Sequence, residues 1–427
     1  MRRAWTIALG SWFLAGVASA QVSLVVTAPT GASGTSYTGY VDRVLSESPI
    51  WADAEAAVRA ADAQIDIARV LPSMRLSGGV SSVDISGARA PNATQVILSM
   101  PLDYAGQTGR RIDARVVEHQ ATIALADGTR RDLSRLAAEH FVDALRASLV
   151  RVRAIEAADA DAALLHAIET RASAGEATAL QVGLARLAAA SGVARRTEAE
   201  GAERTTRLAL SQLLGAVDTS LVPVGDLGIA PHTFDGESLV QEALASRPEV
   251  RAAQLLEATA ERQRDLASAA RWPELDVQVG WLHSFASLAT LFNQPEYDAL
   301  ILGATIEIPI RLAWDGDLRA ADASIDRAQA ALRSAELAVS LEVREALAAY
   351  ETARDRLAAR EGALEEASAL RRAATQALSQ GSGTVVELLA AQAAARDAEG
   401  AYLDAAADHA RTLVILLARV GRSDRVL

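Results

Sequence analysis

The chain has 427 residues, a formal net charge of −12 and no cysteine. We therefore expect no disulfide, no thiol metal site and no lipidated N-terminal cysteine, and the acidic balance argues against nucleic acid as a partner. Aromatic residues make up only 4% of the chain, which together with runs rich in Ala, Leu, Glu and Arg predicts long helices packed side by side.

The first 20 residues have the pattern of a secretory signal peptide. Arg2 and Arg3 precede an apolar run, and Ala18-Ser19-Ala20 forms a small-residue cleavage site. The apolar run is too short to span a bilayer, which needs about 20 apolar residues. A retained membrane anchor is the alternative, but the cleavage motif favours export from the cytoplasm. Residues 21–38 are rich in Ser, Thr and Gly, and we expect them to form an extended leader.

Residues 39–215 are predicted to form a first helix–hairpin–helix unit. A helix to residue 69 is followed by strands at about 73–86 and 93–102, joined around residues 87–92. A long helix over 110–172 and a returning helix to residue 215 complete the unit. Asp127-Gly128-Thr129 is expected to kink the long helix, because a glycine there costs about 1 kcal/mol relative to alanine.

After a connecting segment at 216–247, residues 248–421 predict the same order again, and residues 422–427 form a C-terminal tail. Strands are expected at about 273–286 and 299–311, with a loop from Leu288 to Tyr297 between them. A long helix follows over 316–378. Period-two alternation is clear in these strands, where apolar side chains share one face. The apolar residues on this face are Leu275, Val277, Val279, Trp281, Leu300, Leu302, Ala304, Ile306, Ile308 and Ile310.

The second halves of the two units recur at an offset of 206 positions. The recurring positions are Gly175, Thr178, Gln181, Val182 and Gly215, and then Gly381, Thr384, Glu387, Leu388 and Gly421.

The predicted strands are long enough to cross a membrane when tilted, because about ten residues suffice. A sheet in lipid must close, and the smallest outer-membrane barrels have about eight strands, so four strands from one chain cannot close. Two copies would supply eight strands and three would supply twelve. A solvent-exposed hairpin on a helical domain remains the alternative.

This order of elements, repeated once, resembles the outer-membrane efflux proteins, the TolC-like family. The segments Arg247-Pro248-Glu249-Val250 and Pro309…Gly316-Asp317-Leu318-Arg319-Ala320 resemble its metal and cation efflux (CzcC-like) branch. The resemblance covers nearly all of the mature chain. It implies a mainly α fold with a β membrane part: a homotrimer whose 12-stranded barrel in the outer-membrane lipid continues into a long periplasmic α-helical barrel.

The resemblance also implies the partners and the function. A periplasmic adaptor and an inner-membrane RND-type pump would deliver metal cations or small toxic compounds, which the duct conducts passively to the exterior. Two other functions stay open: a type I protein-secretion duct of the same fold, and a periplasmic coiled-coil adaptor or scaffold with soluble hairpins.

The candidate site residues lie at the two turns between the long and returning helices. The resemblance implies that the turns contact the adaptor, through Gly175, Thr178, Gly381 and Thr384. Glu387 falls on an inner acid of the family, and its counterpart in the first unit is Gln181. Three copies of Glu387 around a threefold axis would concentrate negative charge and favour bound cations at a tunnel constriction. A solvated glutamate is the alternative.

The sequence offers no catalytic, metal-binding or cofactor-binding motif. The six histidines are scattered, none pairs at helical spacing with another, and no Gly-rich phosphate loop or Gly-x-Ser-x-Gly elbow is present. We therefore predict that the protein is not an enzyme and holds no metal or cofactor. The histidines are expected to be packing or surface residues: His119, His140, His166, His232, His283 and His409.

Overall fold

The chain divides into two compact units, and two of the four boundaries between them fall inside its two longest helices. These helices are α3 (Gln107–Ser173) and α7 (Asp315–Ser379), so each contributes residues to both units. The predicted signal peptide lies outside the described residues. Unit 1 comprises residues up to 51, 130–243 and from 341 onward, and unit 2 comprises residues 52–129 and 244–340. The computed structural model describes residues 25–26, 34–70, 73–84, 89–215, 221–285, 296–307 and 315–422.

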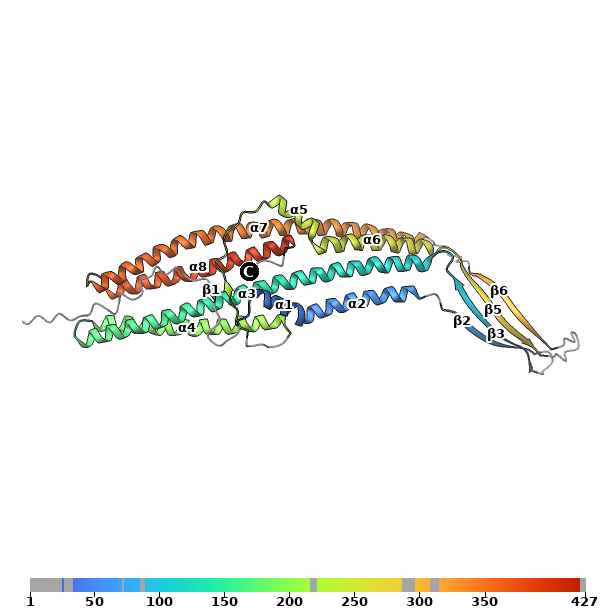
Figure 1. Cartoon of the computed structure of the whole chain (residues 1–427), viewed down its shortest axis with the longest axis horizontal. Coiled ribbons are helices and arrows are strands. Elements are labelled where there is room, and N and C mark those ends of the chain that lie inside the picture. Colours follow the sequence, from blue (N-terminus) through green and yellow to red (C-terminus); the bar gives the residue numbers. More distant parts are fainter. Residues whose placement is uncertain are drawn as a thin grey trace, which may run out of the picture. The chain divides into compact units, whose positions relative to one another are not determined.

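Unit 2 contains a four-stranded antiparallel sheet in the order β2-β3-β5-β6 (Figure 1). Each predicted hairpin supplies two adjacent strands, and β3 of the first hairpin pairs with β5 of the second. Strands β2 and β6 are therefore the two edges of the sheet. The strands are β2 (Arg75–Asp84), β3 (Arg89–Leu102), β5 (Glu274–Ser284) and β6 (Tyr297–Glu307).

Two expected loop segments are partly strand. Strand β3 begins at Arg89, inside the segment expected to join the first hairpin, because the ladder with β2 continues to the pair Asp84 and Arg89. Tyr297, expected to end the second loop, pairs with Ser284 and begins β6. Backbone pairing thus carries both hairpins further than side-chain alternation indicates. The predicted strand residues 308–311 lie outside the described part of the chain.

One face of this sheet, the apolar sheet face, collects apolar side chains from all four strands. Leu98 of β3 lies opposite both Leu76 of β2 and Val279 of β5, and Val279 lies opposite Leu302 of β6. Paired residues of antiparallel strands project to the same side. Leu98 is 37% exposed and Leu302, on an edge strand, is 74% exposed. The other apolar members are Val80, Val96, Met100, Leu102, Leu275, Val277, Trp281, Leu300, Ala304 and Ile306.

The opposite face of the sheet is mostly polar. Gln278 Nε2 donates a hydrogen bond of 2.9 Å to Thr305 Oγ1 across β5 and β6. Ser77 Oγ donates to the Ile97 carbonyl across β2 and β3 at 3.3 Å. The sheet therefore separates an exposed apolar face from a hydrogen-bonded polar face.

The helix expected over residues 39–69 is two helices, α1 (Tyr37–Glu47) and α2 (Pro49–Arg69). Ser48 between them is extended, with φ −67° and ψ 127°. Proline lacks a backbone N–H and disfavours helical geometry in the residue before it, so Pro49 separates the helices. Tyr37 and Thr38, expected to be part of the leader, are the first residues of α1.

In both repeats a helix precedes the hairpin along the chain. Helix α2 precedes the first hairpin, and α6 (Pro248–Ala269) precedes the second. Proline suits the first position of a helix because its fixed φ is helical and its missing N–H has no partner there. Arg264 of α6 donates to Asp322 of α7 over 2.8 Å, which fixes these two helices side by side.

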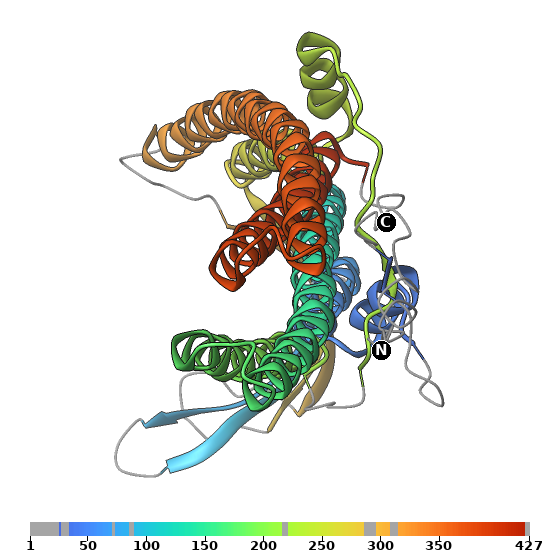
Figure 2. The same ribbon diagram turned by 90° about the vertical axis from the view of Figure 1, so that its left-hand side faces the viewer.

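In unit 1, α3 pairs with α4 (Ala179–Leu213) and α7 pairs with α8 (Val385–Val420), as the end-on view shows (Figure 2). Arg186 of α4 bonds Glu169 of α3 at 2.8 Å, and Arg356 of α7 lies 3.4 Å from Asp408 of α8. The repeats therefore supply one antiparallel helix pair each. The other elements of this region are β1 (Val25–Val26), β4 (Gly225–Asp226) and α5 (Gly236–Ser246).

The hydrophobic core of unit 1 forms where α1 packs on these helix pairs. Tyr40 is completely buried, its ring stacks on Phe141 of α3, and its hydroxyl donates to the Leu210 carbonyl of α4 at 2.7 Å. Val44, Leu403 and Val414 belong to the same cluster. Part of the segment expected to be a loose leader is also ordered, because Val25 and Val26 pair with Asp226 and Gly225.

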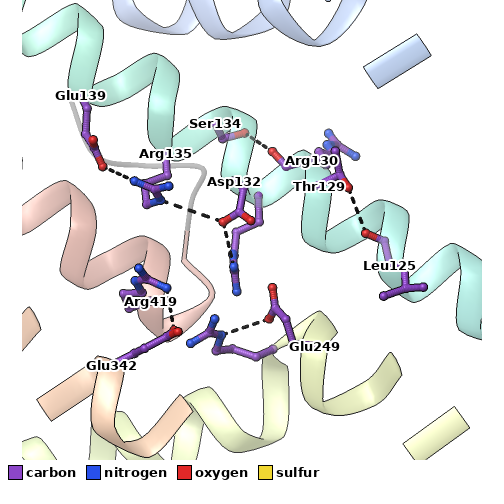
Figure 3. A network of polar contacts seen from close by, with 12 residues as sticks. Leu125, Thr129, Arg130, Asp132, Ser134, Arg135, Glu139, Glu249, Glu342 and Arg419 are labelled. Atoms are coloured by element: carbon purple, nitrogen blue, oxygen red, sulfur yellow. Dashed lines mark hydrogen bonds and ion pairs between the residues drawn. The ribbon is translucent and has the colours of Figure 1, made fainter. Parts of the chain in front are cut away.

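Helix α3 is one unbroken helix through Asp127-Gly128-Thr129, and the kink expected there stays a prediction. In Figure 3 the Thr129 hydroxyl donates to the Leu125 carbonyl one turn earlier, at 3.3 Å. Further along the helix, Arg135 lies between Asp132 and Glu139, and its Nη1 contacts the Glu139 carboxylate at 2.5 Å (Figure 3). The cost of one glycine is small beside the bonds of a helix this long.

Candidate functional site

The two tip turns of unit 1, residues 174–178 and 380–384, have the same geometry. Gly175 and Gly381 have φ of 80° and 75°, which glycine adopts without steric cost. Gly175 N donates to the Ala172 carbonyl and Glu176 N to the Arg171 carbonyl. The equivalent bonds at the second turn run from Gly381 to Leu378 and from Ser382 to Ala377. Both long helices therefore end in a Schellman motif.

Both returning helices begin with a reciprocal capping box. Thr178 Oγ1 accepts from Gln181 N at 3.3 Å, and Gln181 Oε1 accepts from Thr178 N at 2.9 Å. Thr384 and Glu387 make the same pair of bonds at 3.2 and 2.8 Å. Each box satisfies backbone donors that a helix start leaves unpaired. Gln181 and Glu387 thus make the same kind of contact, each capping the start of its own helix. A role for either residue at a tunnel constriction stays a prediction.

A small apolar cluster joins the two tips. Ile168 of α3, Ala185 of α4 and Val385 of α8 are its buried members. Ala177 of the first turn and Leu378 of α7 pack against them. The structure therefore brings the four predicted turn residues of the two repeats to one end of unit 1.

Behind the tips lies a charged centre that the sequence did not single out. Asp161 of α3 has a side chain with no exposed surface, and it pairs with Arg396 of α8 and, at 3.5 Å, with Arg195 of α4. Gly192 makes this approach possible, because a Cβ there would lie 2.8 Å from Asp161 Oδ2 and 3.2 Å from the Ala158 Cα. One buried carboxylate thus holds three helices.

The Asp161–Arg396 pair is one of four ion pairs that the described residues form between α3 and α8. These four pairs are here called the arginine ladder. Arg153 Nε lies 3.1 Å from Glu399, and Arg146 Nε lies 2.7 Å from Asp404. Because α3 belongs to the first repeat and α8 to the second, the ladder joins the two repeats. Its four pairs are Asp161–Arg396, Arg153–Glu399, Arg146–Asp404 and Asp143–Arg411.

His409 of α8 is a buried histidine, as expected of a packing residue, but its ring is unusual. It is 0% exposed, and neither ring nitrogen has a hydrogen-bond partner among the described residues. The ring packs 5.3 Å from that of Tyr350 on α7, whose hydroxyl donates to the His232 carbonyl at 3.1 Å. Burial lowers the pKa of His409, and the nearby His232 and Arg354 lower it further.

We expect this histidine to make unit 1 less stable in acid. The lowered pKa means that the unfolded chain binds more protons than the folded one below about pH 6.5. Its contribution is therefore complete above that pH and declines as the pH falls toward the folded pKa, by at most about 1.4 kcal/mol per pH unit. Thermal unfolding at pH 7.5 and 5.5 should show a smaller acid loss for His409→Phe than for the native chain. His166→Gln, at an exposed position on α3, should keep the native pH dependence.

The described residues contain no group of three His, Asp or Glu side chains arranged to hold a metal ion. Within the same residues, none of the helices is both long and apolar enough to span a membrane. The candidate functional features are therefore the apolar sheet face of unit 2, and the tip turns and charged helix contacts of unit 1.

Residues 40–216 and 239–422 of the chain match the family described as outer membrane efflux protein. The fold resembles that of CusC, studied for conformational changes accompanying folding and transmembrane channel formation, with 19% identity, a TM-score of 0.73, and coverage of 94% of this chain and 96% of CusC. It also resembles the outer membrane protein VceC of Vibrio cholerae, with 19% identity, a TM-score of 0.72, and coverage of 90% and 96%.

A third similar structure is the CmeC outer membrane channel of Campylobacter jejuni, with 17% identity, a TM-score of 0.73, and coverage of 91% of this chain and 86% of that one. None of the curated proteins matches the chain.

Proposed function

Because the chain belongs to the outer membrane efflux protein family, we propose that three copies of it form a passive export duct through the outer membrane. The family consists of transport channels, so the protein is an outer-membrane efflux protein and not an enzyme. Its mainly helical fold, with two repeats that each contain a hairpin, is the one expected from the sequence.

The apolar sheet face is the observation that carries this proposal. It extends over all four strands, and side chains such as Leu300 and Leu302 are 70% and 74% exposed. Soluble proteins rarely expose a continuous apolar surface of this kind. The sheet also has two open edges, β2 and β6, whose unpaired backbone groups could not remain in lipid. Edge-to-edge pairing of β6 with β2 of the next copy would provide partners for these backbone groups and leave the apolar sheet face toward lipid.

A periplasmic adaptor or scaffold with soluble hairpins fits these observations less well. Such a protein would have no use for an apolar face that continues from β2 to β6. A protein-secretion duct would share the fold, and no observation favours it over efflux.

The proposed partners follow from the family resemblance, which assigns the tip turns to contact with an adaptor. Gly175, Thr178, Gly381 and Thr384 lie at one end of unit 1, on rigid turns closed by their own hydrogen bonds. We assign this end to contact with a periplasmic adaptor that leads to an inner-membrane RND-type pump. Metal cations or small toxic compounds are the proposed cargo, on the basis of the sequence resemblance to the cation-efflux branch.

Cell fractionation and conductance test the proposal together. The mature protein should be recovered in the outer-membrane fraction, resist extraction by high salt, and form a trimer in detergent. The purified trimer should give stepwise conductance in a planar bilayer. Recovery in the soluble periplasm would exclude the duct, whereas a membrane-bound trimer without conductance would point to a closed tip.

Glu387→Gln tests the proposed constriction without disturbing the fold. Gln181 caps α4 through its amide oxygen, so a glutamine at 387 should cap α8 in the same way. We expect the variant to keep its unfolding temperature and to lose divalent-cation block several-fold in planar bilayers, because three carboxylates disappear from one ring. Gln181→Glu should strengthen the block. If both variants conduct and are blocked like the native protein, the acid ring does not exist.

A further inference from the structure

A cleft in unit 1 opens between α3, α7 and α8, about three turns of helix away from the tips. Its volume is about 230 Å³, smaller than the pockets that hold drug-sized ligands, so it suits a metabolite-sized molecule. Ala157 of α3 and Ala395 of α8 have small side chains that leave room for the cleft, and polar side chains line the rest of it. These polar side chains include Arg153, Glu156, Arg371, Gln392, Arg396 and Glu399.

Two of the three arginines in the cleft are held in place by acids. Arg153 contacts Glu156 at 2.7 Å and Glu399 at 3.1 Å. Arg396 pairs with the buried Asp161. A guanidinium group has five N–H donors, and these carboxylates use only part of that capacity. Both side chains can therefore present fixed donors to a ligand.

The third arginine leaves the cleft with an excess positive charge. Arg371 of α7 is half-buried, and its guanidinium group has no ion-pair or hydrogen-bond partner in the described part of the chain. The cleft is lined by three guanidinium groups and two carboxylates, and the buried Asp161 behind it is shared by Arg396 and Arg195. In a chain with a net charge of −12, this local excess of positive charge favours an anion.

Gln392 of α8 provides a hydrogen-bond acceptor for a ligand in this cleft. Its Oε1 atom is buried and has no hydrogen-bond donor among the residues that the structure describes. A buried polar atom without a partner costs about 1–3 kcal/mol, so it is normally satisfied by water or a ligand. The atom lines the same cleft as Arg371. A molecule that fills the cleft can satisfy it by offering a hydroxyl or amino N–H donor.

We propose that the cleft between α3, α7 and α8 binds a small carboxylate that also carries a hydroxyl or amino group. The carboxylate pairs with Arg371 and the free donors of Arg153 and Arg396, and the hydroxyl or amino group donates to Gln392 Oε1. The site is separate from the apolar sheet face and the tip turns. It links the helix pairs of the two repeats, so occupancy should also stabilise unit 1.

Citrate and tricarballylate are suitable probes, because they share three carboxylates and only citrate has a hydroxyl. Isothermal titration of the full-length mature protein in detergent should show saturable citrate binding. Tricarballylate should bind about fivefold more weakly, as expected for one lost hydrogen bond. Gln392→Leu should remove that preference. Arg371→Ala should weaken both probes tenfold or more, because it removes a charge-assisted contact.

Arg372→Ala is the matched control. Arg372 is exposed, lies next to Arg371 and does not line the cleft, so its loss removes the same charge and should leave both affinities within about twofold. Equal losses in the two arginine variants would show diffuse attraction and overturn the site. So would equal binding of the two probes, or no saturable binding up to about 10 mM, a very weak affinity. Conductance, measured separately, reports on the duct and not on this cleft.

Discussion

Replacing Leu302 with arginine should prevent the protein from assembling in the outer membrane. Leu302 lies in the middle of β6 on the apolar sheet face, opposite Val279, and is 74% exposed. An arginine facing lipid near the bilayer centre costs about 2–4 kcal/mol per chain. The proposed trimer would carry three such charges. We expect the variant to be lost from the outer-membrane fraction and to show no trimer after detergent extraction.

Gly303→Arg is the control for this prediction, one residue further along the same strand. Gly303 belongs to the opposite face of the sheet, and a Cβ placed there meets no atom within 4 Å. The same charge should be tolerated on that side, with normal membrane recovery and altered conductance. If both variants assemble equally well, the apolar sheet face does not contact lipid. If both fail, the strand tolerates no arginine at all, and Leu302→Asn would separate charge from bulk.

Removing the buried carboxylate of Asp161 should cause the largest loss of stability in unit 1. The side chain of Asp161 has no exposed surface, and that of Arg396 is 22% exposed, so their ion pair is only partly screened by water. Arg195 is 48% exposed, and its contact contributes less. We expect Asp161→Ala to lower the free energy of unfolding by about 2–4 kcal/mol. Denaturant titration followed by circular dichroism would measure it.

Asp159→Ala provides the comparison, because Asp159 is exposed on the same helix two residues earlier. A surface substitution of this kind changes stability by less than about 0.5 kcal/mol. Asp161→Asn should fall between the two variants, since it keeps the volume and one acceptor while losing the charge. If Asp161→Ala unfolds like Asp159→Ala, the helix contacts hold without the buried carboxylate.

The fold was predictable where one residue pattern determines one element. Alternation in β5 and β6 put Val277, Val279 and Trp281 on one face, and the strand register agrees. The repeated order of helices and hairpins identified the family. The family match confirms that identification, and the metal and cation branch stays a prediction. The start of α1 was missed because its first residues look like the Ser-rich and Thr-rich leader before them.

Contacts between distant helices could not be read from the sequence. Asp161 lies in a run of Ala and Asp residues, where neighbouring acids are exposed, and only the packing of α4 and α8 makes it a buried ion-pair partner. The capping boxes are different. Thr followed three residues later by Gln or Glu is a readable helix-start signal, and it explains both Gln181 and Glu387 without any reference to a tunnel.

The arginine ladder has a consequence for alkaline conditions. Every cation in the ladder is an arginine, because the chain contains no lysine. A lysine loses its charge in strongly basic solution, whereas a guanidinium group stays charged there. The bonds between the two repeats should therefore survive the strongly basic washes that strip peripheral proteins from membranes. Reagents that attack lysine side chains should likewise leave all four bonds intact.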